Sequence, residues 1–195
     1  MVQIILIRPG ATQFDQQARV QGSVNIPLSD EGIEQVDRME TELRDQPIRA
    51  IYCSPCESAR QTATQLGKAL DAKVKPIDKL RNVNHGLWEG MLVGDVKRKH
   101  PKVYRQWQES PASVCPPEGE LLGEAMTRVK AALTKVLKKH KEGTIALVTP
   151  DPLAALVRCH VRGAELSEVT VSGNNCGRWE VLDVAAPVGV NGSEV

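Results

Sequence analysis

Two arginines lie where a chain of this kind would hold an anion. Arg8 ends the apolar run Val2–Ile7, and Arg60 lies early in a predicted helix at Glu57–Leu70. Both guanidinium groups are expected to project toward one crevice, because open α/β sheets bind ligands beyond the carboxyl ends of their strands. Two planar guanidinium groups beside a helix N-terminus would bind a phosphoryl group. The alternative is that each arginine only pairs with a surface carboxylate.

The elements that position these arginines follow from the hydrophobic pattern. The run at residues 2–7 is almost continuously apolar, which is typical of a strand buried on both faces of a helix-covered parallel sheet. Further strands are predicted at 49–53, 73–77, 144–149 and 178–182, and helices at 29–43, 57–70, 121–139 and 152–161. Strands that alternate with helices predict an α/β fold, a three-layer α/β/α sandwich with a mostly parallel sheet.

The middle of the chain is less regular. Residues 86–120 predict a lid-like insertion, with a helix near 94–108 that Pro101 interrupts. We expect one domain over residues 1–184, and a disordered tail over 185–195 because that segment is small, polar and rich in glycine.

Composition narrows the class of protein. The net charge of the 195 residues is +1, so no overall field favours nucleic acid or membrane, and no apolar run reaches membrane-spanning length. Aromatic residues make up 3%, too few for a base-stacking surface. Five cysteines, an odd number, fit a reducing compartment, and no secretory signal opens the sequence. We expect a cytoplasmic protein without metal or cofactor.

Four motifs in order resemble the histidine phosphatase superfamily, also called phosphoglycerate mutase-like. The family pattern is R-H-G-x-T, then S-P-x-x-R-A-x-Q-T-A, then a glutamate four residues before a glycine leading into W-E-G, then V-S/T-H-G. This chain has R-P-G-A-T at 8–12, S-P-C-E-S-A-R-Q-T-A at 54–63, N-V-N-H-G-L-W-E-G at 82–90 and V-T-P-D at 148–151. The resemblance spans residues 2–182 and implies a phosphoglycerate mutase-like fold.

The departures from this pattern fall on the chemistry. The resemblance implies that the histidine that attacks phosphorus is replaced by Pro9, the second histidine by Pro150, and the acid glutamate by Asn82. Proline offers no side-chain lone pair and no N–H, and asparagine cannot protonate a leaving alkoxide. The chain is therefore predicted to be a pseudophosphatase, without catalytic residues.

Phosphate binding is a separate question. The residues predicted to bind phosphate are Arg8, Arg60, Thr12, Gln21 and Asn82. Asp15 stands where the resemblance implies an asparagine, and Asp151 follows Pro150, so these carboxylates would repel an anion or pair with the two arginines. Both outcomes are left open: a pocket that binds a phosphorylated small molecule, and a neutralised crevice.

A relocated nucleophile is the competing hypothesis. His85 precedes Gly86 near the expected crevice, and Cys53 and Cys56 lie at a strand-to-helix turn near Arg60. The alternatives are a solvent-exposed or loop-bridging histidine and buried, inert thiols. If one of these groups acts, the protein is an active phosphomonoester hydrolase.

A third possibility is a module that binds a protein partner and no small ligand. Basic residues occur at 97–105 and at Lys135, Lys138, Lys139 and Lys141, and are interpreted as a solvated helix face and a helix C-terminus. Neither set predicts nucleic-acid binding. The sequence names neither the ligand nor the oligomeric state.

Overall fold

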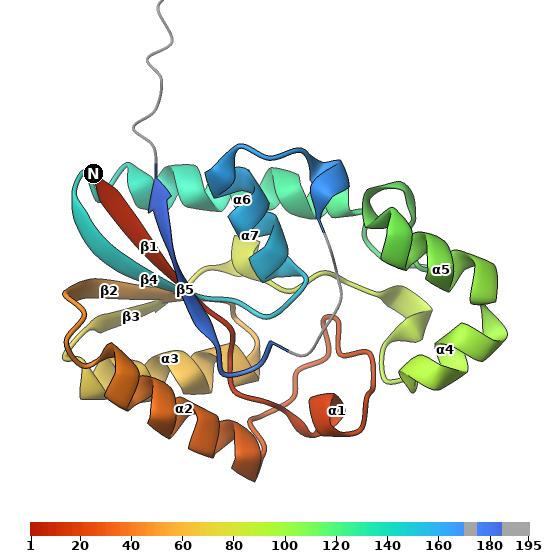
Figure 1. Ribbon diagram of the computed structural model, residues 1–195, viewed down its shortest axis with the longest axis horizontal. Coiled ribbons are helices and arrows are strands. Elements are labelled where there is room, and N and C mark those ends of the chain that lie inside the picture. Colours follow the sequence, from red (N-terminus) through yellow and green to blue (C-terminus); the bar gives the residue numbers. More distant parts are fainter. Residues whose placement is uncertain (170–174, 185–195) are drawn as a thin grey trace, which may run out of the picture.

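A five-stranded sheet forms the centre of the computed structural model, which describes residues 1–169 and 175–184 (Figure 1). The strands are β1 Val2–Ile7, β2 Ile48–Cys53, β3 Lys73–Pro76, β4 Gly143–Val148 and β5 Trp179–Val184, in the order β3-β2-β4-β1-β5. The first four strands run parallel to one another, and β5 pairs antiparallel with β1. The predicted α/β class with a mostly parallel sheet is confirmed.

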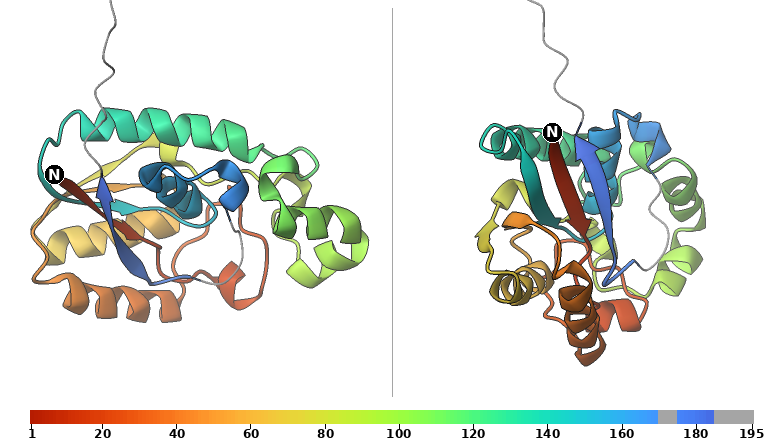
Figure 2. Two further views of the ribbon diagram at one scale, coloured as in Figure 1. Left: turned by 45° about the horizontal axis from the view of Figure 1, so that its top comes forward. Right: turned by 60° about the vertical axis from the view of Figure 1, so that its left-hand side comes forward.

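Helices cover both faces of this sheet, and the side chains of β1 show why. Ile5 and Ile7 belong to the apolar cluster shared with helices α2 (Asp30–Leu43) and α3 (Glu57–Ala69). The alternate residues Ile4 and Leu6 belong to the cluster shared with α6 (Leu122–Leu137) and α7 (Leu153–Arg162). Because successive strand residues point to opposite faces, a continuously apolar strand requires a helix layer on each side (Figure 2).

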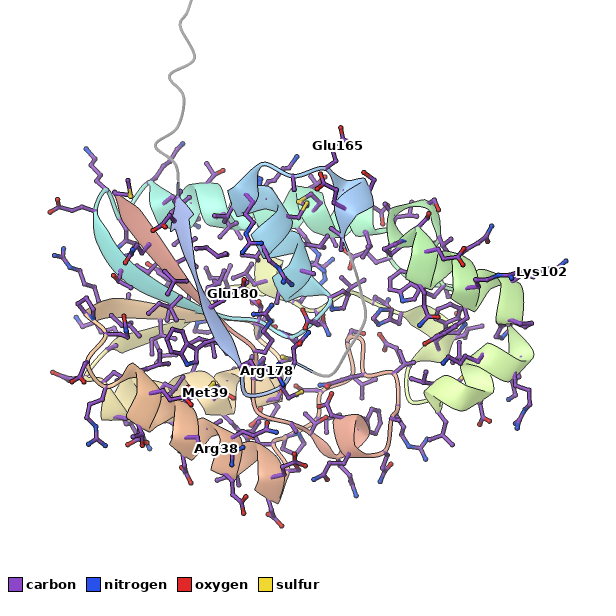
Figure 3. All side chains as sticks on the ribbon, in the orientation of Figure 1. Arg38, Met39, Lys102, Glu165, Arg178 and Glu180 are labelled. Carbon is purple, nitrogen blue, oxygen red and sulfur yellow. The ribbon has the colours of Figure 1, made fainter. Side chains whose placement is uncertain are left out.

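The buried apolar side chains of the four long helices belong to these two clusters. On α2, Met39 is buried at 1% exposure while its neighbour Arg38 is exposed (Figure 3). Ser29 caps this helix by accepting a hydrogen bond from the backbone N–H of Gly32 at 3.2 Å, as the sequence predicted. The predicted positions of the four long helices agree with the structure to within a few residues.

One short helix and four 3₁₀ turns were not predicted from the sequence. The segment predicted as a loop after β1 contains a short helix, α1 (Gln13–Gln16), which Thr12 and Asp15 close with a capping box. Such a four-residue helix has no hydrophobic period of its own, so only its cap could have revealed it. The remaining short elements are 3₁₀ turns: η1 Asp78–Leu80, η2 Gly86–Trp88, η3 Pro111–Ser113 and η4 Leu166–Glu168.

The predicted insertion forms two short helices beside the sheet. Helix α4 (Val93–Lys99) is followed by His100, and α5 (Pro101–Glu109) begins at Pro101 (Figure 1). The proline divides the expected helix because it cannot donate the backbone hydrogen bond that would continue α4. Trp88 and Trp107 pack edge to face, with ring centroids 6.3 Å apart, and both belong to the apolar cluster that includes the buried face of α6.

A buried ion pair fixes the segment that leads from β3 into the insertion. Arg128 of α6 contacts Glu120 at 2.8 Å and donates to the backbone carbonyls of Lys79 at 2.9 Å and Asn82 at 3.1 Å. Both side chains of the pair are nearly buried, at 9% and 10% exposure. Burial raises the pKa of Glu120, but the hydrogen bonds and charge of Arg128 outweigh it and hold that pKa below its usual range.

No described helix combines the length and apolar character needed to cross a membrane. The tail predicted to be disordered, residues 185–195, lies outside the described residues, as do residues 170–174.

Replacing Gly32 by alanine should destabilise the protein, although glycine-to-alanine changes in helices usually stabilise. A Cβ at Gly32 would overlap the backbone carbonyl of Ala11, in the loop after β1. We expect the free energy of unfolding to fall by roughly 1–3 kcal/mol, the usual cost of overpacking. The midpoint of guanidinium denaturation measures this change.

Gly94→Ala on α4 is the matched control, because a Cβ there meets nothing within 4 Å. It should raise the midpoint, by up to about 1 kcal/mol, through helix propensity alone. Equal effects from the two variants would contradict the close packing of α2 against the loop after β1.

Candidate functional site

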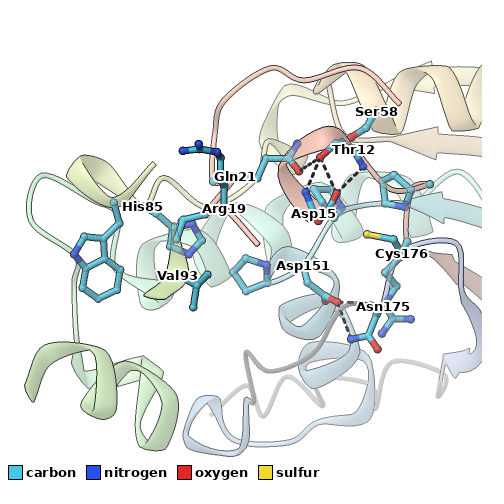
Figure 4. Close-up of a pocket in the computed structure, with 18 of the residues that line it drawn as sticks. Thr12, Asp15, Arg19, Gln21, Ser58, His85, Val93, Asp151, Asn175 and Cys176 are labelled. Carbon is cyan, nitrogen blue, oxygen red and sulfur yellow. Dashed lines mark hydrogen bonds and ion pairs between the residues drawn. The ribbon is translucent and has the colours of Figure 1, made fainter. Parts of the chain in front are cut away.

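A cavity of about 220 Å³ opens at the carboxyl ends of β1 and β4 (Figure 4). Arg8, Pro9 and Gly10 follow β1, and Pro150 and Asp151 follow β4; all five line the cavity. The two strands are adjacent and parallel, so the two turns meet at one edge of the sheet. The crevice therefore lies where the strand pattern predicted it.

Arg8 is buried, and carboxylates already surround its guanidinium group. Its side chain is 7% exposed, with Nη1 2.7 Å from Glu180 and Nε 3.8 Å from Asp151. Glu180 is also approached by Arg158 at 3.8 Å and Arg162 at 3.5 Å. An anion entering the cavity would have to compete with two carboxylates for this arginine.

Arg60 does not join Arg8, so that part of the predicted site is wrong. Its side chain is exposed and does not line the cavity; the cavity residue from the same helix is Ser58. Two residues along a helix rotate a side chain by about 200°, so Ser58 and Arg60 cannot face one crevice. Counted from Ser54, the arginine of the S-P-x-x-R-A-x-Q-T-A pattern falls on Ser58.

The two aspartates play different roles. Asp15 accepts hydrogen bonds at 2.7 Å from both the backbone N–H and the hydroxyl of Thr12, closing the cap of α1. Asp151 accepts a hydrogen bond from Asn175 at 3.1 Å and lies beside Arg8 (Figure 4). The predicted pairing of a carboxylate with an arginine thus occurs between Asp151 and Arg8.

Thr12 and Gln21 line the cavity as predicted, whereas Asn82 lies beside it. Asn82 is 3% exposed; its side-chain N–H groups donate to the carbonyls of Gly22 at 2.9 Å and Asp151 at 3.3 Å, and its Oδ1 accepts from Val83 at 2.9 Å. The amide therefore joins three backbone segments. The prediction that Asn82 contacts a phosphate is not supported by this arrangement.

The outer end of the cavity is aromatic. His85, Trp88, Tyr104 and Trp107 line it, and the rings of His85 and Trp107 lie edge to face at 5.2 Å. Within the described residues, neither Nδ1 of His85 nor Nε1 of Trp88 has a hydrogen-bond partner. Unpaired buried polar atoms around a cavity indicate places where a ligand or water would bind.

His85 is neither solvent-exposed nor loop-bridging, the two alternatives that sequence favoured. Its side chain is buried at 8% exposure, because the insertion folds Trp107 over it. Burial lowers the pKa of His85 to about 4, although the charges of Glu89 and Glu120 act in the opposite direction. The imidazole is therefore neutral at pH 7.

Neither thiol proposed as a nucleophile reaches the cavity. Cys53 is buried, and burial, followed by the charge of Cys56, raises the pKa of Cys53 to about 11. Cys176, which no sequence pattern identified, does line the cavity. Burial and the charge of nearby Asp15 raise the pKa of Cys176, which keeps it a thiol rather than a thiolate at neutral pH.

Glu180 and Cys176 have no motif that could have identified them. Both come from the last described segment, where β5 pairs antiparallel with β1. Across residues 1–169 and 175–184, no group of three or more His, Cys, Asp or Glu side chains is placed to hold a metal ion.

Comparison with known proteins places this architecture in a family. Residues 4–184 match the family model of the histidine phosphatase superfamily, branch 1. Phosphoserine phosphatase 1 of Hydrogenobacter thermophilus is 31% identical over 182 residues, which cover 93% of this chain and 86% of that protein.

Solved structures show the same fold at lower identity. Bacillus stearothermophilus YhfR superposes with a TM-score of 0.86 at 20% identity, covering 95% of this chain and 92% of its own. A putative alpha-ribazole-5'-P phosphatase from Escherichia coli gives a TM-score of 0.80 at 23% identity, covering 92% and 89%. At this identity the two structures establish the fold alone.

The burial of neutral His85 should make stability depend on pH. The pKa of His85 is about 4 in the folded protein, against about 6.5 for an unperturbed histidine, so the unfolded chain binds more protons between these values. Stability is therefore full above pH 6.5 and should fall by about 3 kcal/mol as the pH drops toward 4. Denaturant midpoints measured across this range test the slope.

His85→Gln should remove most of that slope, because glutamine does not titrate. His100→Gln, a change of the same kind in the insertion, should leave it in place. A slope that survives in His85→Gln would mean that His85 is not the buried group that titrates.

Proposed function

The chain belongs to the histidine phosphatase superfamily, and from that membership we propose that it is a pseudophosphatase, which keeps the fold and the pocket but transfers no phosphoryl group. The observation that carries this proposal is the position of Pro9 and Pro150. Both line the cavity where the family pattern has its two histidines. Neither offers a lone pair to phosphorus or an N–H to an oxyanion.

Two further positions support the loss of catalysis. Asn82, at the position of the acid glutamate, cannot protonate a leaving group, and its amide is already bonded to the backbone of Gly22 and Val83. Ser58 stands where the pattern has its arginine, so α3 supplies no guanidinium group to the cavity, and the second arginine of the lining, Arg19, already donates to Gln17 and to the carbonyl of Gly90. Losing the nucleophile alone from such a coupled set costs on the order of a millionfold in rate.

The occupant of the pocket is part of this proposal. A phosphorylated ligand would have to displace Glu180 or Asp151 from Arg8 and would meet the carboxylate of Asp15. We therefore favour a small ligand that is not a phosphate monoester, bound between Arg8 and the aromatic outer end. The alternative is that the protein binds a protein partner and no small ligand.

We also propose that the protein works in the cytoplasm. Five cysteines, an odd number, suit a reducing compartment better than a framework of disulfides.

An active hydrolase that uses His85 is a second candidate, and the surroundings of His85 favour it. His85 lines the cavity, is neutral at pH 7 and has an Nδ1 without a partner among the described residues. A neutral imidazole can form an N–P bond with a phosphomonoester while the P–O bond breaks and the alcohol leaves with a proton from water, and a second water then hydrolyses the phosphohistidine to phosphate. The same hypothesis is not supported for Cys53 and Cys56, which lie outside the cavity lining.

The first test is hydrolysis of p-nitrophenyl phosphate from acidic to neutral pH. We expect no turnover above that of Arg8→Ala, because the cavity offers no nucleophile of the family type. Turnover that vanishes in Arg8→Ala would overturn the pseudophosphatase proposal. If turnover vanishes in His85→Ala but not in Cys53→Ala/Cys56→Ala, the second candidate is correct.

The carboxylate beside Arg8 should limit phosphate affinity. Asp151→Asn keeps the shape of the side chain and removes one negative charge, so we expect inorganic phosphate to bind about tenfold more tightly, a difference of roughly 1.4 kcal/mol. Isothermal titration of both proteins measures the change. Asp183→Asn, on an exposed face of β5, is the control for net charge and should have no effect.

A further inference from the structure

A second cavity, separate from the first, lies between the edge of the sheet and α6. Its volume is about 470 Å³, and residues from β2, β3, η1 and α6 line it. The floor is apolar and includes Tyr52, Ile77, Ala132 and Val136. None of the residues around the first cavity lines this one.

The rim of this cavity is strongly basic. Lys75 of β3, Lys79 of η1, and Lys135 and Lys139 at the end of α6 line it, against a single carboxylate, Asp78. Ion pairs in the described part of the chain all use arginines, so carboxylates do not neutralise these four lysines at contact distance. We name this cavity with its four lysines the lysine groove.

The helix dipole explains only half of this arrangement. Lys135 and Lys139 lie near the C-terminus of α6, where cations interact favourably with the dipole, yet two like charges four residues apart repel each other. Lys75 and Lys79 come from other elements, β3 and η1, so the position of α6 in the sequence does not account for them. The position of all four lysines around one cavity therefore needs an explanation other than the helix dipole.

The lysine groove is braced on both sides. Arg128 of α6 holds the carbonyl of Lys79 at 2.9 Å and thereby fixes η1 against the helix that carries Lys135 and is followed by Lys139. On the other side, the hydroxyl of Tyr52 on β2 lies 2.8 Å from Nε2 of His140, just beyond α6. The elements that present the lysines are thus held in place before any ligand binds, which lowers the cost of binding.

We propose that the lysine groove binds a small organic polyanion, a ligand with two or more phosphoryl groups on an apolar body. Four ammonium groups around one cavity match clustered phosphoryl oxygens, since lysine acts as a compact charge with three donors. The apolar floor would accept the body of the ligand, and the volume lies within the usual range for small-molecule sites.

An extended acidic peptide fits less well. It would add to the open edge of β3, but this strand has four residues and ends in Pro76, which has no N–H to pair with a new strand. The inference does not depend on the pseudophosphatase proposal, because the groove and the first cavity share no lining residues.

Isothermal titration of the full chain with tripolyphosphate, ATP and adenosine tests the proposal. We expect tripolyphosphate and ATP to bind, more weakly as salt rises, ATP more tightly than tripolyphosphate, and adenosine not to bind measurably. Lys135→Gln/Lys139→Gln and Lys75→Gln/Lys79→Gln should each weaken binding about tenfold or more.

Lys99→Gln/Lys102→Gln is the matched control, with the same loss of charge on the insertion, where Lys102 lies at the far end of the molecule (Figure 3). It should leave the affinity unchanged. Equal weakening in this control would show that only net charge matters and would overturn the proposal.

Three other results would also overturn it: no binding of tripolyphosphate or ATP, tighter binding of a hexaglutamate peptide than of tripolyphosphate, or affinity lost in Arg8→Ala, which would place the anion in the first cavity. None of them bears on whether the first cavity hydrolyses phosphate esters.

Discussion

The ion pair between Arg128 and Glu120 is the constraint on which both cavities depend. Arg128 is nearly buried and reaches from α6 to the carbonyls of Lys79 and Asn82. The first carbonyl belongs to η1 at the lysine groove, and the second belongs to a residue beside the first cavity. A buried pair of this kind adds little net stability, but breaking it leaves an uncompensated charge that costs roughly 3–5 kcal/mol. In this fold the pair holds the irregular segment from Lys79 to Asn82 against α6.

The first cavity accommodates two prolines at the ends of its strands without disturbing the sheet. Proline restricts the residue before it to extended backbone, and both Pro9 and Pro150 follow residues that continue parallel strands. The backbone N–H of Arg8 still donates to Arg178 at 2.8 Å, and that of Thr149 to Ile7 at 2.9 Å. The sheet therefore keeps its hydrogen bonds up to the last residue before each proline, so the two prolines change the side chains at the cavity and leave the strands intact.

Regular elements were predictable from the sequence, and irregular ones were not. The apolar run of β1 and the helical period of α6 each constrain a whole element, so the predicted bounds of both elements agree closely with the structure. Arg60 was wrongly placed in the crevice because it lies only two residues after Ser58, the position of the pattern arginine. The rotation of about 200° between these two helix positions turns Arg60 away from the cavity. Glu180 and Cys176 were missed because β5 returns antiparallel beside β1, a long-range contact that no local pattern reveals. His85 was misjudged because its burial depends on Trp107, 22 residues further along the chain.

The two kinds of basic residue divide between two tasks. In the described chain arginines make the ion pairs, and the buried ones, Arg8 and Arg128, each contact a carboxylate within 3 Å. Planar guanidinium groups suit this role because they are weakly hydrated and donate in a fixed fork. Lysines stay at the surface, where the ammonium keeps its water until a ligand replaces it. The charge of Arg8 at the first cavity is thus already paired within the protein, whereas the charge around the lysine groove is available to a ligand from solution.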